Sequence, residues 1–266
     1  MSDSVRPGTN VIPTIPNSAR IWNYAQDGQD NYQVDRELGD VMLGAFPEIK
    51  TAAMESRAFQ ERVAYHVVKE FGIRQLLDLG TGIPTGSGTH GMAQKAAAES
   101  RVVYVDNDPV VLNHVSTLRS SPEGKIHYFL QDFRDVDAVL EGASKTLNLD
   151  EPVALLVLST LGHFPAAEAA DLIEQYTSRF ASGSYLAVCD TIETPGVLRM
   201  QEHYLAADPE GAYLARTPEQ IADCARGLTL IPPGVGPLPK LVLPDAITPS
   251  PEADECVQWG FLAVKP

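Results

Sequence analysis

Three aspartates lie where apolar runs of this chain end, and they are the residues best placed to bind a ligand. They are Asp78, Asp106 and Asp132. If the runs are parallel strands, their carboxyl ends meet at one edge of a sheet, where open α/β folds bind ligands. The spacing therefore predicts that three carboxylates line a nucleoside-binding edge.

A glycine turn, Gly80-Thr81-Gly82, follows the first of these runs. Glycines at a strand end let backbone N–H groups approach a ligand closely. The dinucleotide fingerprint of dehydrogenases requires another glycine three residues later, where this chain has Thr85. This difference counts against a nicotinamide-dependent oxidoreductase. It favours a turn that runs beneath the methionine moiety of S-adenosylmethionine, where no pyrophosphate must be bound.

The order of the strands predicts a role for each polar residue at this edge. Asp106 would accept hydrogen bonds from both ribose hydroxyls, and Asp132 would accept a hydrogen bond from the adenine amino group. Each aspartate has a structural alternative, because Asp78, Asp106 and Asp132 could each only cap the turn or helix that follows. The candidate cofactor-binding residues are Asp78, Gly80, Thr81, Gly82, Asp106, Asn107, Asp132, Phe133 and Ser159.

Short apolar runs alternate with longer helical patterns after residue 72, which is typical of parallel β-α-β units. Five strands are expected in series, at residues 75–79, 102–105, 126–130, 153–158 and 185–189, with two more at 228–231 and 256–264. Helices are expected between them, at residues 89–99, 109–118, 136–143 and 166–180, with another that starts at Thr217. This predicts an α/β fold whose ligand-binding domain spans residues 73–266.

The first 72 residues have a different pattern. Prolines and the lack of apolar periodicity predict a flexible arm over residues 1–16, and helical patterns predict a cap over residues 17–72. Polar and aromatic side chains gather in the first two helices and their loop, which suits a lid over a ligand, although a solvated helix face is the alternative. The candidate lid or substrate residues are Arg20, Tyr24, Asn31 and Tyr32.

Several long strings of the chain resemble the S-adenosyl methyltransferase family, formerly a domain of unknown function. They are Ala19-Arg20-Ile21-Trp22-Asn23-Tyr24, Asp30-Asn31-Tyr32, Arg57-Ala58-Phe59, residues 77–85 and Val103-Tyr104-Val105-Asp106-Asn107-Asp108-Pro109. The resemblance implies a class I methyltransferase (Rossmann-like) fold, a seven-stranded sheet with its last strand antiparallel, and S-adenosylmethionine as cofactor. It implies little about the methyl acceptor.

The chain departs from the family pattern at three places. Asp27-Gly28-Gln29 lacks a lysine that is common there, Leu161-Gly162-His163-Phe164 carries an extra glycine, and Cys189-Asp190-Thr191 stands where a histidine is common. These differences put a shared acceptor in doubt.

Methyl transfer from a sulfonium mainly requires that donor and acceptor are held in line, so a general base is not strictly necessary. The candidates for one are His163, after the fourth strand, and Asp190, at the end of the fifth. Glu193, His203 and Tyr204 are weaker candidates. The Asn/Asp-Pro-Pro-Tyr motif of enzymes that methylate nucleic-acid amino groups is absent after the fourth strand, where Ser159-Thr160-Leu161-Gly162 stands instead.

Composition narrows the class of partner. The net charge of −15 argues against a nucleic-acid backbone, and the apolar runs are too short to span a membrane. The three cysteines have no metal-ligand spacing and suit a reduced cytoplasm. We therefore expect a cytoplasmic methyltransferase with a small-molecule substrate, methylated on oxygen or nitrogen, and no metal. The alternative is a non-catalytic module that binds S-adenosylmethionine or its demethylated product; the oligomeric state is not predicted.

Overall fold

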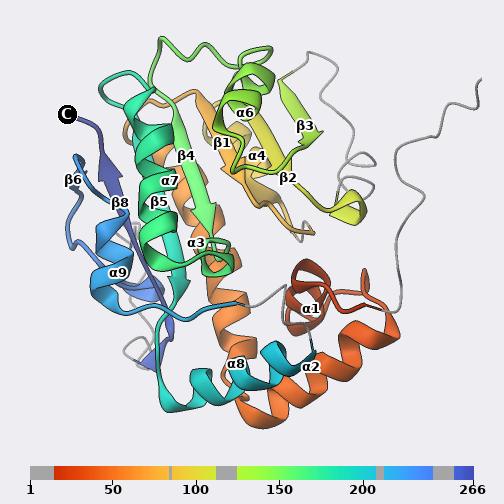
Figure 1. Ribbon diagram of the computed structural model, residues 1–266. Coiled ribbons are helices and arrows are strands. Elements are labelled where there is room, and N and C mark those ends of the chain that lie inside the picture. The colour runs from red at the N-terminus through yellow and green to blue at the C-terminus, as the bar shows by residue number, and fades with distance from the viewer. Residues whose placement is uncertain (1–14, 84–85, 112–124, 208–212, 242–254) are drawn as a thin grey trace, which may run out of the picture.

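An eight-stranded sheet, with helices on both faces, forms the body of the protein (Figure 1). The computed structural model describes residues 15–83, 86–111, 125–207, 213–241 and 255–266. Its strand order is β3-β2-β1-β4-β5-β8-β6, and β7 pairs with β8. The strands are β1 (Gln75–Leu79), β2 (Arg101–Asp106), β3 (Ile126–Leu130), β4 (Ala154–Leu158), β5 (Tyr185–Thr191), β6 (Thr229–Leu230), β7 (Gly236–Pro237) and β8 (Gln258–Val264).

The first five strands are parallel, as the sequence pattern predicts. β1 lies at the centre and pairs with β2 on one side and β4 on the other. The strand order therefore reverses between β1 and β4, and open α/β sheets bind ligands at the carboxyl edge of such a switch point. β1 and β4 are apolar and almost completely buried because helices cover both of their faces.

The C-terminal part of the sheet is antiparallel. β8 runs antiparallel to β5, and β6 and β7 pair antiparallel with β8. This confirms the antiparallel last strand. The eighth strand, β7, was not predicted, because a two-residue strand within a proline-rich segment is too short to show a period of two. The proline-rich segment spans residues 232–251, and its residues 242–251 lie outside the described part of the chain.

Two cores lie on opposite faces of the sheet. One face packs against α6 (Val136–Ala143), α7 (Ala166–Ser178) and α9 (Pro218–Asp223), and the other against α3 (Ile49–Lys69) and α4 (Gly88–Ala96). Side chains of β1 alternate between them, since Leu77 and Leu79 join the first core and Leu76 joins the second. No helix in the described ranges is both long and apolar enough to cross a membrane.

A third apolar cluster joins the front helices α1 (Ser18–Ala25) and α2 (Gln33–Ala45) to the start of α3 and to α8 (Pro195–Ala207). These helices lie below the carboxyl edge of the sheet (Figure 1). Asn17 caps α1, and its side chain accepts a hydrogen bond from the Arg20 backbone N–H.

Helix α8 was not among the helices predicted from the sequence. Its signals are present in the sequence: Thr194 accepts from the Val197 backbone N–H, Pro195 is the first helical residue, and Val197, Met200 and Tyr204 share one buried side. Of the helix expected over residues 109–118, residues 109–111 are helical and residues 112–118 lie outside the described part, as do residues 1–14 of the expected arm.

Candidate active site

A cavity of about 400 Å³ opens between the carboxyl edge of the sheet and the helices α1, α2 and α8. Its volume lies in the roughly 300–1,000 Å³ range of small-molecule sites. All three predicted aspartates, Asp78, Asp106 and Asp132, line it. The central geometric expectation, that these residues share one cleft, is therefore met.

Asp78 lies in the floor of the cavity and is 2% exposed. Its Oδ2 accepts hydrogen bonds from Gln60 Nε2 at 3.0 Å and from Thr89 Oγ1 at 2.5 Å. Burial raises the pKa of this carboxyl to about 6, while its two donors and the nearby Arg57 favour the ionised form. Gln60 and Thr89 could not be predicted as partners of Asp78, because they become its neighbours only when α3 and α4 pack on the sheet.

The glycine turn has the left-handed backbone that its sequence suggests. Gly80 and Gly82 have φ values of 64° and 60°, and the Gly80 N–H donates to the carbonyl of Val105 at 2.8 Å. Thr160 packs so closely against Gly80 that no Cβ would fit, and its hydroxyl donates to the Gly80 carbonyl at 3.2 Å. Thr81, between the glycines, also lines the cavity.

Asp106 ends β2, is half-buried and links two turns. Its Oδ2 accepts from the Gly82 N–H and its Oδ1 from the Asp108 N–H, each at 2.9 Å. Burial raises the pKa of this carboxyl to about 6, against the effect of the backbone donors. Asp106 therefore organises the loop, as its structural alternative proposes, and also faces the cavity together with Asn107.

Asp132 and Phe133 follow β3, and both line the cavity. Asp132 pairs with Arg134, and hydrogen bonds from that guanidinium lower the pKa of the carboxyl. The Phe133 ring is 8% exposed and packs edge-to-face on Phe164, with the ring centroids 5.3 Å apart. The two residues thus present a carboxylate and an aromatic ring to the same part of the cavity.

Ser159 follows β4 at a φ of 54°, which is uncommon for a residue with a side chain. Its hydroxyl lies 2.7 Å from that of Ser56 on α3 and donates to Gln258 Oε1 at 3.2 Å. Gln258 Nε2 in turn donates to Thr191 Oγ1 at 2.6 Å. This network fixes the ends of β4, β5 and β8 against α3.

His163 is the predicted catalytic residue that reaches the cavity. It ends a 3₁₀ turn, η1 (Leu161–His163), and packs edge-to-face on Tyr213 with a centroid distance of 5.3 Å. Tyr213 also lines the cavity, and Gly162 leaves the space for its ring. The extra glycine in this loop, a departure noted in the sequence, therefore has a packing role.

Asp190 lies behind Tyr213 and does not line the cavity. It is 1% exposed, accepts from the Tyr213 hydroxyl, and lies 3.5 Å from Arg216 Nε. Burial raises the pKa of Asp190 to about 6. The geometry therefore assigns Asp190 to the positioning of Tyr213 and not to direct contact with a ligand.

Of the weaker candidates, Tyr204 lines the cavity, whereas Glu193 and His203 are exposed residues outside it.

The four residues predicted to form a lid or to contact substrate do not line the cavity, so the prediction for these residues is corrected. Arg20 is 4% exposed and donates to Asp35 Oδ2 at 2.6 Å, and its guanidinium lies over the Tyr32 ring. Tyr24 donates to Asp40 at 2.7 Å, and Asn31 donates to Asn23 Oδ1 at 3.0 Å. Their polar groups satisfy one another within the helical front, a pairing that sequence spacing does not reveal.

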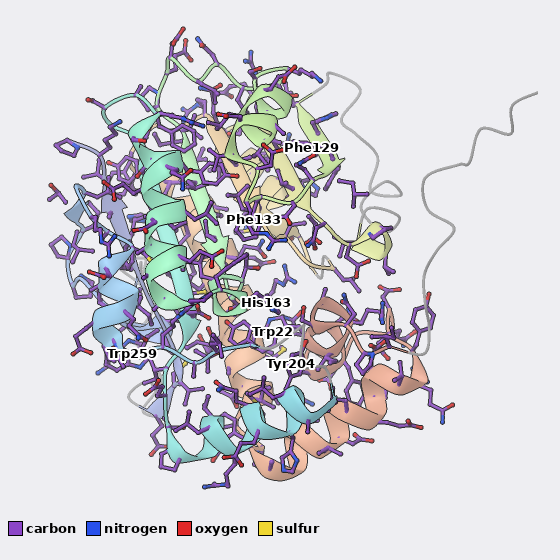
Figure 2. All side chains as sticks on the ribbon, in the orientation of Figure 1. Trp22, Phe129, Phe133, His163, Tyr204 and Trp259 are labelled. Carbon is purple, nitrogen blue, oxygen red and sulfur yellow. The ribbon has the colours of Figure 1, made fainter. Side chains whose placement is uncertain are left out.

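Other residues of the same front face the cavity, among them Asn17, Trp22 and Asn23. Figure 2 shows Trp22, His163 and Tyr204 between the sheet and the lower helices, and all three line the cavity. Helical periodicity was a signal for part of this set, because Ser18, Ile21 and Trp22 share one side of α1. It was no signal for Asn23, which lies three residues after Arg20 and therefore on the side of Arg20 and Tyr24.

Arg57 on α3 lines the cavity although the sequence did not predict a role for it. Its guanidinium donates to Gln60 Oε1 at 2.5 Å and to the Ile83 carbonyl at 3.0 Å, and burial lowers its pKa. Its Nε has no partner among the described residues, and neither has Oδ2 of Asp108, which also lines the cavity. A ligand that bears hydroxyl donors and a carboxylate would satisfy these atoms, so the donor set fits S-adenosylmethionine.

Comparison with known proteins agrees with this geometry. A family model described as S-adenosyl methyltransferase matches residues 7–266. A DUF574 family protein from Streptomyces avermitilis is 34% identical with a TM-score of 0.89, covering 96% of this chain and 100% of that chain. A putative methyltransferase from Thermobifida fusca is 28% identical with a TM-score of 0.89, covering 98% of this chain and 99% of that chain.

More distant structures share the fold alone. The mitomycin 7-O-methyltransferase is 14% identical with a TM-score of 0.52, and the match covers 82% of this chain and 56% of that chain. Comparison with curated proteins finds no match. Because the family model covers nearly the whole length, the chain belongs to the S-adenosyl methyltransferase family.

Proposed function

We propose that this protein transfers the methyl group of S-adenosylmethionine to an oxygen or nitrogen atom of a small molecule. The observation that carries the proposal is one continuous cavity, which joins the strand-end carboxylates Asp78 and Asp106 to an apolar end beneath α1, α2 and α8. The first end suits a nucleoside and the second suits an acceptor. When bound, S-adenosylmethionine supplies an electrophilic methyl group.

The residues of the sheet edge would divide the cofactor between them. Asp106 and Asn107 would accept from the ribose hydroxyls, Asp132 and Phe133 would flank the adenine, and Arg57 would pair with the methionine carboxylate. Gly80 and Gly82 expose the backbone of the turn, because neither carries a side chain that would cover it. Arginine is suited to the carboxylate because its planar guanidinium can donate two parallel hydrogen bonds.

His163 is the residue proposed to accept a proton from the acceptor. It lines the cavity, and histidine is the side chain that most commonly acts as a general base near neutral pH. Asp190 is proposed to act through Tyr213, which packs on the His163 ring. Alignment of donor and acceptor would still supply most of the rate enhancement, because the methyl group is already activated.

The proposed partner is a small molecule and not a nucleic acid or a membrane. The net charge of −15 supports this, because binding to a phosphate backbone depends on basic side chains. We also propose a cytoplasmic location, and the three free, buried cysteines Cys189, Cys224 and Cys256 are consistent with a reducing compartment.

Calorimetric titration of the full chain tests the proposal. S-adenosylmethionine and S-adenosylhomocysteine should both bind with dissociation constants on the order of micromolar, about −8 kcal/mol, and NAD should not bind. Tight NAD binding, or no binding of the two adenosyl ligands, would contradict the assignment. Transfer of labelled methyl groups to compounds in a metabolite extract then separates an enzyme from a protein that only binds the cofactor.

A further inference from the structure

Charge is unevenly distributed along the cavity. The charged side chains among its described lining residues all belong to the sheet edge and its neighbours on α3 and the β3–α6 loop: Arg57, Asp78, Asp106, Asp108, Asp132 and Arg134. The opposite end, called here the acceptor chamber, has apolar walls formed by Trp22, Met42, Phe46, Ile49, Met200 and Tyr204. The polar residues that line the cavity from α1 and α8, among them Asn23, Gln26 and Gln201, are uncharged. No described residue that lines this chamber carries a formal charge.

The acceptor chamber is built into the third apolar cluster and is not a gap between loops. Five of its six walls belong to that cluster as buried residues, and Trp22 packs against it while remaining partly exposed to the cavity. Phe46 keeps its place because Gly196 on α8 has no side chain: a Cβ there would lie 2.6 Å from Phe46 Cδ2. The walls are therefore preformed by the packing of α2 against α8.

We infer that the methyl acceptor is an uncharged, apolar ring compound whose reacting group is a hydroxyl. This inference rests on the proposed function, since it names the substrate class of the same cavity. Moving a charged group from water into a chamber without a counter-charge is costly, and apolar surface gains free energy there. Aromatic walls, Trp22, Phe46 and Tyr204, favour flat rings, while Met42 and Met200 adapt to their outline.

A hydroxyl suits this end better than an amine. An aliphatic amine is an ammonium ion at neutral pH and would need a carboxylate beside it, which the described walls of the acceptor chamber lack. A hydroxyl enters uncharged. Its oxygen bonds to the methyl carbon as the methyl–sulfur bond breaks and leaves its electron pair on sulfur, and the hydroxyl proton passes to His163.

The test uses the full chain saturated with S-adenosylhomocysteine and three probes that share one ring system: 1-naphthol, 1-naphthoate and 1-naphthylmethylammonium. Trp22 and Trp259 are the two tryptophans of the sequence, so a Trp259→Phe background leaves Trp22 as the tryptophan reporter. Naphthol should quench Trp22 and bind at least about tenfold more tightly than either charged probe, because they would bury an unpaired charge.

A charged wall should reverse this selectivity. Met200→Lys places a cation in the acceptor chamber and should shift the preference from naphthol to naphthoate. Leu198→Lys is the matched control, because Leu198 lies on the same helix with 41% of its surface exposed and does not line the cavity. It should leave the order of the three probes unchanged.

The outcomes separate the two proposals. Loss of S-adenosylhomocysteine binding in the unmodified protein contradicts the proposed function itself. If S-adenosylhomocysteine binds but naphthol does not, or if a charged probe binds as well as naphthol, the inference about the acceptor is overturned. The selectivity of the unmodified protein decides this even if Met200→Lys fails to fold, and Met42→Lys on α2 provides a second charged wall.

Discussion

The carboxylate of Asp106 accepts a hydrogen bond from the Gly82 backbone N–H at 2.9 Å, and so ties the end of β2 to the turn that follows β1. The first strand of this pair, β1, also borders the switch point between β1 and β4. The same carboxylate thus holds the glycine turn in shape and faces the cavity, where we propose that it binds the cofactor.

Replacement of Asp106 by alanine should weaken the binding of S-adenosylmethionine by about 1 to 3 kcal/mol, because the ribose hydroxyls would lose their acceptor. Calorimetry well below the unfolding temperature measures this. The loop contacts are lost as well, so thermal unfolding is recorded in parallel. Wild-type affinity in a folded Asp106→Ala protein would show that the aspartate serves only the loop.

Arg57 should contribute to binding only through the methionine carboxylate of S-adenosylmethionine. Arg57→Met should weaken S-adenosylmethionine by about 1.5 to 3 kcal/mol, the range for a hydrogen bond to a charged group. Methylthioadenosine, which lacks the amino-acid moiety, should keep its wild-type affinity. Arg62→Met is the control, because Arg62 lies on the same helix and donates to the Leu238 carbonyl at 2.9 Å outside the cavity.

If Arg57→Met weakened both ligands equally, the guanidinium would only support the shape of the site through Gln60 and Ile83. Equal affinity for S-adenosylmethionine in Arg57→Met and wild type would exclude a role for this guanidinium in carboxylate binding.

Gly162→Ala should lower turnover while the cofactor still binds. A Cβ at this position would lie 2.5 Å from Cζ of Tyr213, so the ring that packs on His163 must move. We expect kcat to fall on the order of tenfold, the effect of about 1.4 kcal/mol on the barrier, with an unchanged affinity for S-adenosylhomocysteine.

Gly44→Ala is the matched control for this substitution. Gly44 lies within α2 with no atom within 4 Å of the added Cβ, so alanine there should stabilise the helix by roughly 0.5–1 kcal/mol and leave turnover unchanged. Full activity of Gly162→Ala would mean that the position of Tyr213 does not matter for methyl transfer.

The stability of the ligand-free protein should depend on the ionisation of Asp78. Its pKa is raised to about 6 by burial, so the folded state holds this proton more tightly than the unfolded state. Its contribution to the free energy of unfolding is therefore greatest below about pH 4 and falls as the pH rises through about 6. Asp78→Asn removes this dependence and keeps an oxygen that can accept from Gln60 or Thr89.

Urea unfolding at about pH 4.5 and pH 7.5 compares the variant with wild type. The variant should gain up to roughly 3 kcal/mol relative to wild type at the higher pH, since each pKa unit corresponds to about 1.4 kcal/mol. The difference is informative because His66, His90 and His127, whose pKa values are lowered by burial, affect both proteins alike. A constant difference between the two pH values would show that Asp78 has an ordinary pKa.

The sequence by itself determined the sheet edge. Short apolar runs, glycines at left-handed positions and aspartates at strand ends are local features, and local sterics and hydrogen bonding fix what they form. Asp78, Asp106 and Asp132 could therefore be assigned to one cleft before the structure was known. The antiparallel last strand followed from family resemblance.

Only the tertiary structure decided which residues of the helical front and of the strand-five edge face the ligand. Arg20 and Asp35 are separated by 15 residues, yet they form a buried ion pair that removes Arg20 from the cavity. Asp190 is likewise paired, with Tyr213. Long-range packing sets such pairings, because a buried charge takes whichever partner the folded chain brings within reach, and residue spacing carries no record of that choice.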